Sequence, residues 1–249
     1  YKQLDHKPQR TTNIMASLQE AKKTVLDFHK EIEKSSAEGI EEILSKYTNG
    51  NDYCFRSVYP FREVKGGAEA VSKTFWEPFK QSFTKIQRRP DIFIGGDNSI
   101  GDGIWVLSMG HFLGLFDKDW LGIRASRQIA TIRYAEFSKI SSDNKIVQTG
   151  LFLDIVALMQ SVGMNPLPPS TGAHFHYPGP KSHDGLHMTH DAPAKEGIET
   201  QALVDRMIED LSSINHAMSC GPELLQRTWH DDMLWYGPAG IGASYTIPR

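Results

Sequence analysis

The chain has few of the features that mark secreted or membrane proteins. It contains only two cysteines, Cys54 and Cys220, which cannot build a disulfide-rich scaffold and indicate reduced thiols. No apolar run approaches the roughly 20 residues that a membrane-spanning helix needs. The first residues, YKQLDHKPQRTT, lack the apolar region of a signal peptide. We therefore expect a cytoplasmic protein that does not bind a membrane.

The chain also lacks an excess of charge and a phosphate-binding loop. It has 27 basic and 30 acidic residues, and no basic block is present, so we expect no nucleic-acid partner. The stretch GGDNSIGDG at 95–103 has no Lys-Ser/Thr pair and does not lead from a strand into a helix, which predicts a hairpin turn. Apolar residues make up 39% of the 249 residues, which is typical of one large globular domain or two smaller ones.

Apolar periodicity predicts three helices in the first third of the chain. Apolar residues recur every seven positions from Leu18 to Ile32, which indicates one apolar stripe along a helix. A short second helix is predicted over 37–47. In the third, over 66–83, apolar residues are four positions apart, and Pro78 is expected to kink or split the helix.

From residue 90 the apolar period changes to two, which is typical of strands. The turn sequence SDNK at 142–145 and other short connections indicate an antiparallel meander, and the segment 155–163 reads as a closing helix. The sequence thus predicts an α+β fold with three helices packed on one face of a curved antiparallel sheet. The four predicted strands of the meander are 91–96, 103–116, 127–140 and 145–154, and a shorter strand is predicted earlier, over 52–60.

The second half of the chain has a different organisation. Residues 166–198 are rich in Pro, Gly and His and read as a linker. Residues 199–249 repeat the order helix, helix, strand that opens the first domain at 13–165. We therefore expect a partial second domain of the same type after the linker.

Several short strings, in this order along the chain, resemble a known family. The sequence resembles the SnoaL-like polyketide cyclases of the nuclear-transport-factor-2-like superfamily, in its two-domain type, over about 15–168 and again over a truncated copy at 199–249. The strings are GHFLG (110–114), DWLGI (119–123), RYAEF (133–137), KIV (145–147), FLDIVALMQSVG (152–163) and HDDMLWYGPAGIG (230–242).

The resemblance implies a cystatin-like cone that closes around an apolar pocket. In that group a pocket carboxylate is the general acid/base of an aldol cyclisation, without a metal or an organic cofactor. The resemblance also implies a homodimer that forms through the open face of the sheet. We therefore expect a small hydrophobic carbonyl ligand and no cofactor.

The candidate acid/base residues are Asp154, Glu136 and His111, with Tyr134 as a hydrogen-bond donor. Each also has a structural explanation: Asp154 directly precedes a predicted helix and suits its N-cap, and Glu136 could be an exposed, ion-paired residue. His111 could be a hydrogen-bonded core residue. The family often has an earlier acid where this chain has Leu151. The residues expected to line the pocket are Tyr53, Trp76, Trp105, Met109 and Phe152.

Two functions remain open from the sequence. The first is a cofactor-free general acid/base enzyme that catalyses aldol cyclisation, isomerisation or hydrolysis of a small apolar carbonyl compound. The alternative, which Leu151 favours, is a non-catalytic ligand-binding or dimerisation scaffold of the same fold. A metal site is a third, weaker hypothesis, because no predicted helix or strand orients the linker histidines and no cysteine accompanies them. These are His174, His176, His183, His187 and His190.

Overall fold

The structure is a computed structural model that describes residues 11–98, 103–169, 172, 182–214 and 221–245. The chain divides into two compact units. Unit 1 comprises Tyr1–Met164 and Gly179–Asp191, and unit 2 comprises Asn165–Pro178 and Ala192–Arg249. The expected boundaries of the two domains and the linker stay a prediction.

The helices of unit 1 follow the predicted order. The third predicted helix runs without a break but changes its winding: a π-helical turn, η2 (Ser72–Trp76), lies between α3 (Gly67–Val71) and α4 (Glu77–Ser82). Pro78 lies in the first turn of α4, and because proline has no N–H it removes one hydrogen bond from the ladder at this point. The remaining helices are α1 (Thr11–Lys34), α2 (Ile40–Tyr47), the short 3-10 turn η1 (Gly50–Asp52) and α5 (Ile155–Ser161).

The sheet of unit 1 has six strands in the order β2-β1-β6-β5-β4-β3. The last four form the predicted antiparallel meander, whereas β1 pairs with β6 in parallel, so the sheet is mixed rather than wholly antiparallel. Parallel strands need a long connection, and here the helices α3 and α4 and the first three strands of the meander lie between β1 and β6 along the chain. The strands are β1 (Cys54–Ser57), β2 (Glu63–Val64), β3 (Phe83–Asp97), β4 (Ile104–Phe116), β5 (Ile129–Ile140) and β6 (Ile146–Leu153).

Strand β3 begins eight residues before the start that the sequence predicts. Its pairing with β4 shifts register between Thr84 and Gln87 and again between Pro90 and Ile92. These irregularities break the simple alternation of apolar residues, which explains why the sequence pattern reveals only the second half of the strand. Pro90 is tolerated because β3 is an edge strand of the sheet.

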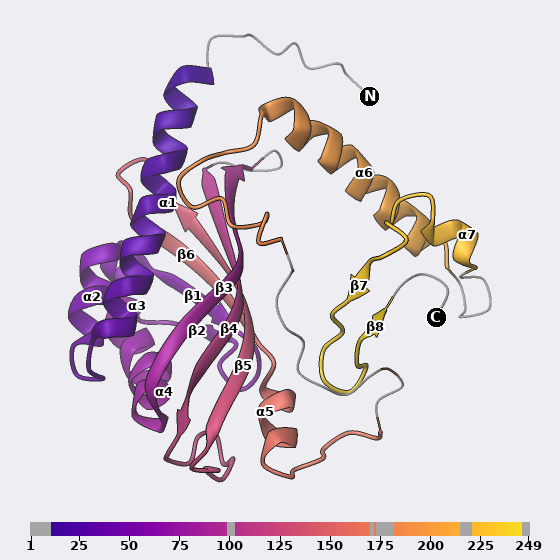
Figure 1. The fold of residues 1–249 in the computed structure, drawn as a ribbon. Helices are drawn as coiled ribbons and strands as arrows, with labels where there is room; N and C mark the ends of the chain where they lie inside the picture. The colour runs from indigo at the N-terminus through magenta and orange to yellow at the C-terminus, as the bar shows by residue number, and fades with distance from the viewer. Residues whose placement is uncertain (1–10, 99–102, 170–171, 173–181, 215–220, 246–249) are drawn as a thin grey trace. The chain divides into compact units, whose positions relative to one another are not determined.

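Helices α1 to α4 cover one face of the curved sheet (Figure 1), which confirms the predicted α+β class. On this inner face the even-numbered residues of β4 and β5 are buried against the helices, among them Val106, Phe112 and Ile132. Aromatic side chains from the helices and strands fill the space between the two layers. They include Phe28, Phe55, Phe75, Trp76, Phe79, Phe83, Phe116 and Trp120.

A part of the predicted linker packs on the edge of the sheet in unit 1. The backbone N–H of Phe93 donates to Gly185 O, and His187 N–H donates to Phe93 O, both at 2.8 Å. Lys22 of α1 is fully buried and donates to the Asp191 carboxylate and to the His190 carbonyl oxygen, both at 2.7 Å. The exposed edge of β3 is therefore partly paired by residues 182–191.

Unit 2 contains less regular structure. It has the helices α6 (Ala194–Ser212) and α7 (Pro222–Leu225) and a two-stranded hairpin of β7 (Leu234–Trp235) and β8 (Ser244–Tyr245). The proposal that this unit is a partial copy of the first domain stays a prediction.

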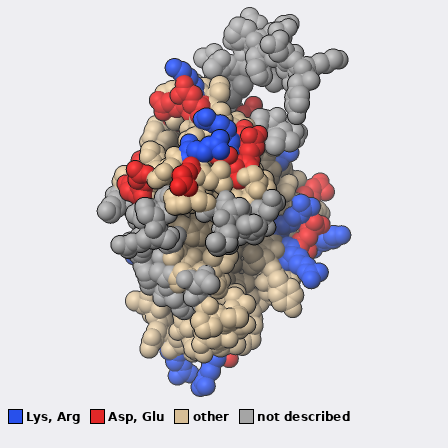
Figure 2. Space-filling view, turned by 90° about the vertical axis from the view of Figure 1, so that its right-hand side faces the viewer, with Lys and Arg blue, Asp and Glu red and all other residues tan. Residues whose placement is uncertain are grey.

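None of the helices among the described residues is long and apolar enough to cross a membrane. Cys54 is a free thiol, and Cys220 lies outside the described residues. On the face drawn in Figure 2, acidic and basic side chains are interspersed, so this face shows no extended patch of one charge sign.

Candidate functional site

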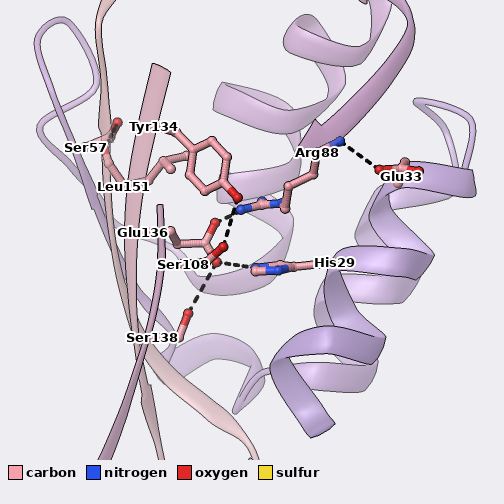
Figure 3. A network of polar contacts seen from close by, with 9 residues as sticks. All are labelled: His29, Glu33, Ser57, Arg88, Ser108, Tyr134, Glu136, Ser138 and Leu151. Atoms are coloured by element: carbon pink, nitrogen blue, oxygen red, sulfur yellow. Dashed lines mark hydrogen bonds and ion pairs between the residues drawn. The ribbon is translucent and has the colours of Figure 1, made fainter. Parts of the chain in front are cut away.

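A buried carboxylate, Glu136 of β5, is the centre of a polar network inside unit 1 (Figure 3). Its side chain is 1% exposed and receives hydrogen bonds from two long-range partners. His29 Nε2 of α1 lies 2.6 Å from Oε1, and Arg88 Nη2 of β3 donates to Oε2 at 3.0 Å. Ser138 Oγ adds a longer contact of 3.4 Å. One helix and two strands therefore bring a carboxylate, an imidazole and a guanidinium together.

The network fixes the ionisation of its members. Burial alone would raise the pKa of Glu136, but the charge of Arg88 and the hydrogen bonds from Arg88 and His29 outweigh it and lower the pKa to about 2. Burial and the nearby Arg88 charge lower the pKa of His29. At neutral pH, Glu136 is thus an anion and His29 is neutral. Because a carboxylate can only accept, His29 donates its Nε2–H, and Nδ1 carries the lone pair.

Arg88 is held by aromatic rings as well as by Glu136. Its guanidinium lies 4.7 Å from the ring centroid of Phe112 and 4.6 Å from that of Tyr134. Its backbone N–H donates to Glu33 Oε2 at 2.7 Å. The guanidinium also donates a hydrogen bond to the Tyr134 hydroxyl. The terminal nitrogen Nη1 of Arg88 is buried and has no close hydrogen-bond partner among the described residues.

Tyr134 lies beside this network on the same face of β5 as Glu136. Its hydroxyl and that of Ser108 in β4 are 2.9 Å apart, and the ring is 1% exposed. Burial raises the pKa of Tyr134, so that the phenol keeps its proton near neutral pH. The protonated phenol can donate a hydrogen bond, and the role of Tyr134 as a donor in catalysis stays a prediction.

His29 and Arg88 line a small hollow between α1, the segment η2–α4 and β3. The hollow has a volume of about 10 Å³, enough for roughly one water molecule. Lys80 of α4 also lines it and donates to the carbonyl oxygens of Ile32 and Glu33. The lining residues are His29, Ile32, Glu33, Trp76, Phe79, Lys80, Ile86, Arg88 and Phe112.

Four of the site residues predicted from the sequence are buried in the interior of unit 1, between the helices and the sheet. Glu136 and Tyr134 belong to the network, and Trp76 lines the hollow. Tyr53 is 3% exposed, and its pKa is raised mainly by burial, with a smaller contribution from the charge of Glu136. The aromatic residues Tyr53 and Trp76 also belong to the hydrophobic core.

Four other predicted residues lie on the opposite, outer face of the sheet. In β4 the buried inner positions are even-numbered, so Trp105, Met109 and His111 face away from Glu136. His111 Nδ1 lies 3.4 Å from Asp91 Oδ2. Phe152 of β6 is 56% exposed. The structure therefore does not bring these side chains to the network. The sequence could not predict this, because a strand with two apolar faces does not reveal which face is the inner one.

Asp154 adopts the capping role that the sequence also allows. Its Oδ1 accepts a hydrogen bond from the N–H of Ala157 at 3.0 Å and so caps α5. Its Oδ2 lies 3.5 Å from Arg133 Nη2. Leu151, by contrast, is fully buried on the inner face and pairs directly with Glu136 across the two strands. The inward position at this level of β6 is therefore apolar.

Sequence reasoning missed His29 and Arg88. A signal for His29 exists, because it is four residues after Val25 and three before Ile32, both on the apolar stripe of α1. Arg88 carries no comparable signal, because it lies between the two register shifts of β3, where alternation does not predict burial. For His29, its place within the apolar stripe of α1 indicates that it is buried and that a buried polar partner exists.

No metal site is formed by the described residues: no group of three or more His, Cys, Asp or Glu side chains among them could hold an ion. Of the linker histidines, His187 and His190 stack with ring centroids 4.7 Å apart. His174 and His176 lie outside the described residues.

No family model matches the sequence, and no curated protein matches it either. Among similar solved structures is a protein from Jannaschia sp. CCS1 provisionally named a SnoaL-like polyketide cyclase, with 16% identity, 66% of this chain and 100% of that chain covered, and a TM-score of 0.47. AclR from Streptomyces galilaeus, provisionally named a hydroxylase, is 16% identical over 61% of this chain and 100% of its own, with a TM-score of 0.48. IdmH from Streptomyces antibioticus, provisionally named a polyketide cyclase, is 13% identical over 58% of this chain and 99% of its own, with a TM-score of 0.45.

The first of these structures carries the family name that the sequence resembles. Similarity at this level, below 25% identity and below a TM-score of 0.5, does not transfer an activity from one protein to another. The chemistry of the site therefore has to follow from the side chains of this chain.

Proposed function

We propose that unit 1 is a cofactor-free general acid/base enzyme of the polyketide-cyclase-like type that acts on a small carbonyl compound. The observation that carries the proposal is the buried pair of His29 and Glu136, with Nε2 and Oε1 2.6 Å apart. A neutral imidazole whose second nitrogen is bound to a carboxylate is the usual arrangement of a positioned general base. Glu136 itself is ionised and shielded by its partners, so we assign it the positioning role and His29 the proton transfer.

The proposed step moves one proton and one electron pair. His29 Nδ1 takes a proton from the carbon next to the substrate carbonyl, and the electron pair of the broken C–H bond moves onto the carbonyl oxygen and forms an enolate. The carboxylate of Glu136 stabilises the imidazolium that results, and the Arg88 guanidinium stabilises the negative oxygen. Return of the proton to another carbon gives isomerisation. Attack of the enolate carbon on a second carbonyl forms an alkoxide instead, which takes the proton back from His29 and gives the aldol product.

Tyr134 remains in this proposal as a donor next to Arg88, because its ring and its hydroxyl belong to the same network. Asp154 and His111 have no part in it. The first caps α5 and pairs with Arg133, and the second lies on the outer face near Asp91. An acid/base role for either residue would require a substrate on the outer face or at the end of β6.

The alternative function, a non-catalytic scaffold, is favoured by the small size of the hollow. Its volume of about 10 Å³ admits a single oxygen-sized group, and the aromatic side chains of Trp76, Phe79 and Phe112 line it. For catalysis, Trp76, Phe79 or Lys80 must move aside when a substrate enters. A scaffold would keep the network of Glu136 for its contribution to packing alone.

Deuterium exchange separates the two functions without knowledge of the natural substrate. The protein is incubated in D₂O with cyclohexanone and with levulinate, and incorporation of deuterium next to the carbonyl is followed by NMR. We expect the wild-type protein to accelerate exchange of at least one probe. His29→Gln should lower the accelerated rate by roughly 10²- to 10⁴-fold, which is the usual contribution of a general base.

His230→Gln is the matched control, because this exposed histidine belongs to unit 2. It should leave the exchange rate unchanged. If the wild-type protein accelerates exchange of neither probe, or if both variants retain the full rate, the acid/base proposal is wrong and the scaffold function takes its place.

A further inference from the structure

A short segment, residues 182–191, docks on the edge of the sheet within unit 1, and we call it the strap. The backbone N–H of Phe93 in β3 donates to Gly185 O, and the N–H of His187 donates to Phe93 O, both at 2.8 Å. Two partly buried apolar side chains of the strap pack against the hydrophobic core; they are Leu186 and Met188. The strap therefore binds β3 in the way that an added edge strand does.

The strap ends in an ion pair with a fully buried lysine of α1. Lys22 Nζ donates to Asp191 Oδ1 at 2.7 Å, and the exposed fractions of the two side chains are 0% and 15%. Gln19, three residues earlier in α1, donates to the other oxygen of the same carboxylate. The stem of Lys22 passes closely over Gly95 of β3, where an added Cβ would lie only 3.2 Å from Lys22 Cγ. At this point α1, β3 and the strap are therefore held together.

The strap contacts the two elements that carry the partners of Glu136. His29 lies seven residues after Lys22 on α1, which is about two helical turns, so both side chains project from the same buried face of the helix. Arg88 lies five residues before Phe93 on β3. A clamp outside the polar network therefore holds the helix and the strand that meet inside it.

We propose that the strap is a latch that positions His29 against Glu136 by holding α1 on β3. Lys22 and Asp191 are its positioning residues, because they act through α1 and do not touch the network. The desolvation of two buried charges offsets most of their attraction, so such a pair favours one arrangement of the elements more than it adds stability. Without Asp191, the Lys22 ammonium is a buried charge without a counter-ion, and α1 has to move away from β3 to hydrate it.

The inference rests on the proposed function only where it concerns the rate of proton transfer. A base misplaced by about 1 Å can lose about 10²-fold in rate, so release of the strap should lower the activity although every group of the network is still present. The docking of the strap and its effect on the bond between His29 and Glu136 require no catalysis. They can be measured in the absence of any substrate.

Hydrogen exchange in the ¹⁵N-labelled full chain tests the latch with two signals. The backbone N–H of Phe93 reports whether the strap is docked, because it donates to Gly185 O. The Nε2–H of His29 reports the site, because it lies in the buried bond to Glu136. If the strap positions α1, release of the strap exposes both protons to exchange with water.

Two variants release the strap by different routes. Asp191→Asn removes the charge that pairs with the buried lysine, whereas His187→Pro removes the N–H that bonds to β3. Each should speed the exchange of both signals by about tenfold or more, because each removes one bond of the latch. Each should also lower the deuterium exchange of the carbonyl probe by up to about 10²-fold. Asp191→Glu keeps the carboxylate and should stay close to the wild type. The control Asp232→Asn, the same substitution at an exposed position of unit 2, should change nothing.

The amides between β4 and β5 separate release of the strap from unfolding of unit 1, because they should keep their wild-type exchange rates. Four results would overturn the inference: faster exchange of Phe93 without a change at His29, wild-type exchange of Phe93 in both variants, an equal response of the amides between β4 and β5, or an equal response to Asp232→Asn. A wild-type protein that accelerates no carbonyl exchange would overturn the proposed function, whereas the response of His29 to the strap would still stand.

Discussion

His29 of α1 and Glu136 of β5 form a buried hydrogen bond of 2.6 Å across 107 residues of sequence. The contact joins the helical layer to the inner face of the sheet. Because Arg88 binds the other oxygen of Glu136, neither partner of the carboxylate can be removed without leaving a buried charge or an unpaired polar atom.

Removal of the Glu136 charge should strongly destabilise unit 1. Glu136→Gln leaves the Arg88 guanidinium, which is 6% exposed, without its counter-ion, and the loss of one partner of a buried ion pair typically costs about 3 to 5 kcal/mol. Urea unfolding measures the effect. The control is Glu63→Gln, whose ion pair with Arg56 is exposed, and this change should cost less than about 1 kcal/mol. Equal costs for the two variants would contradict the account.

The stability of the protein should fall with acidification in two steps. The pKa of His29 is lower in the folded protein than its ordinary value of 6.5, so the unfolded chain binds the proton more tightly, and stability declines as the pH falls below 6.5. The pKa of Glu136 is lowered from 4.5 to about 2, which contributes about 3 kcal/mol at neutral pH. That contribution is lost as the pH falls from 4.5 towards 2.

Unfolding by urea at a series of pH values separates the two groups. His29→Gln should abolish the decline between pH 6.5 and the acid range in which carboxyl groups titrate. It should leave a smaller lower step, because Arg88 still lowers the pKa of Glu136 whereas the contribution of His29 is lost. A variant that keeps the full wild-type decline would show that another group is responsible for the upper step.

Asp154 should contribute to stability rather than to proton transfer. Asp154→Ala removes the cap of α5 and the contact with Arg133, and loss of an N-cap costs about 1 kcal/mol. Thermal unfolding measures this loss, and the deuterium exchange described above measures the activity. Retained stability together with lost exchange would reverse the assignment and restore Asp154 as an acid/base residue.

We expect the chain to form a homodimer through the outer face of the sheet. Phe137 of β5 and Phe152 of β6 contact each other edge-to-face on this side, with ring centroids 6.1 Å apart, and are 39% and 56% exposed. Light scattering should give twice the chain mass of 28.0 kDa, and Phe152→Glu should reduce it to the mass of one chain. Ile198→Glu on α6, also at an exposed apolar position, should leave the dimer intact. A wild-type monomer would contradict this prediction.

The regular elements of unit 1 could be predicted from the sequence because their apolar periods are clean. The ends of β4, β5 and β6 lie within two residues of the prediction, and Asn144 occupies the left-handed conformation that the predicted turn favours, with a φ of 58°. The start of β3 could not be predicted, because its register shifts interrupt the alternation. The parallel pairing of β1 with β6 joins segments almost 100 residues apart, which no local pattern indicates.

The candidate site could be predicted only in part, for a related reason. Glu136 and Tyr134 share a strand face, so alternation places them together correctly. His111 and Met109 share a face as well, but both faces of β4 are apolar, and the inner one is identified only by tertiary contacts. His29 and Arg88 approach Glu136 from other elements, and the distance between elements is not encoded in any single segment.

The protonation of His29 tests the central claim most directly. The ring nitrogens of the ¹⁵N-labelled protein distinguish the two neutral tautomers and the imidazolium, and their shifts can be followed over a pH titration. We expect a neutral ring at pH 7 with the proton on Nε2, bound to Glu136, and a pKa below 6.5. A ring that is charged at pH 7, or one that carries its single proton on Nδ1, would contradict the role of His29 as the positioned base.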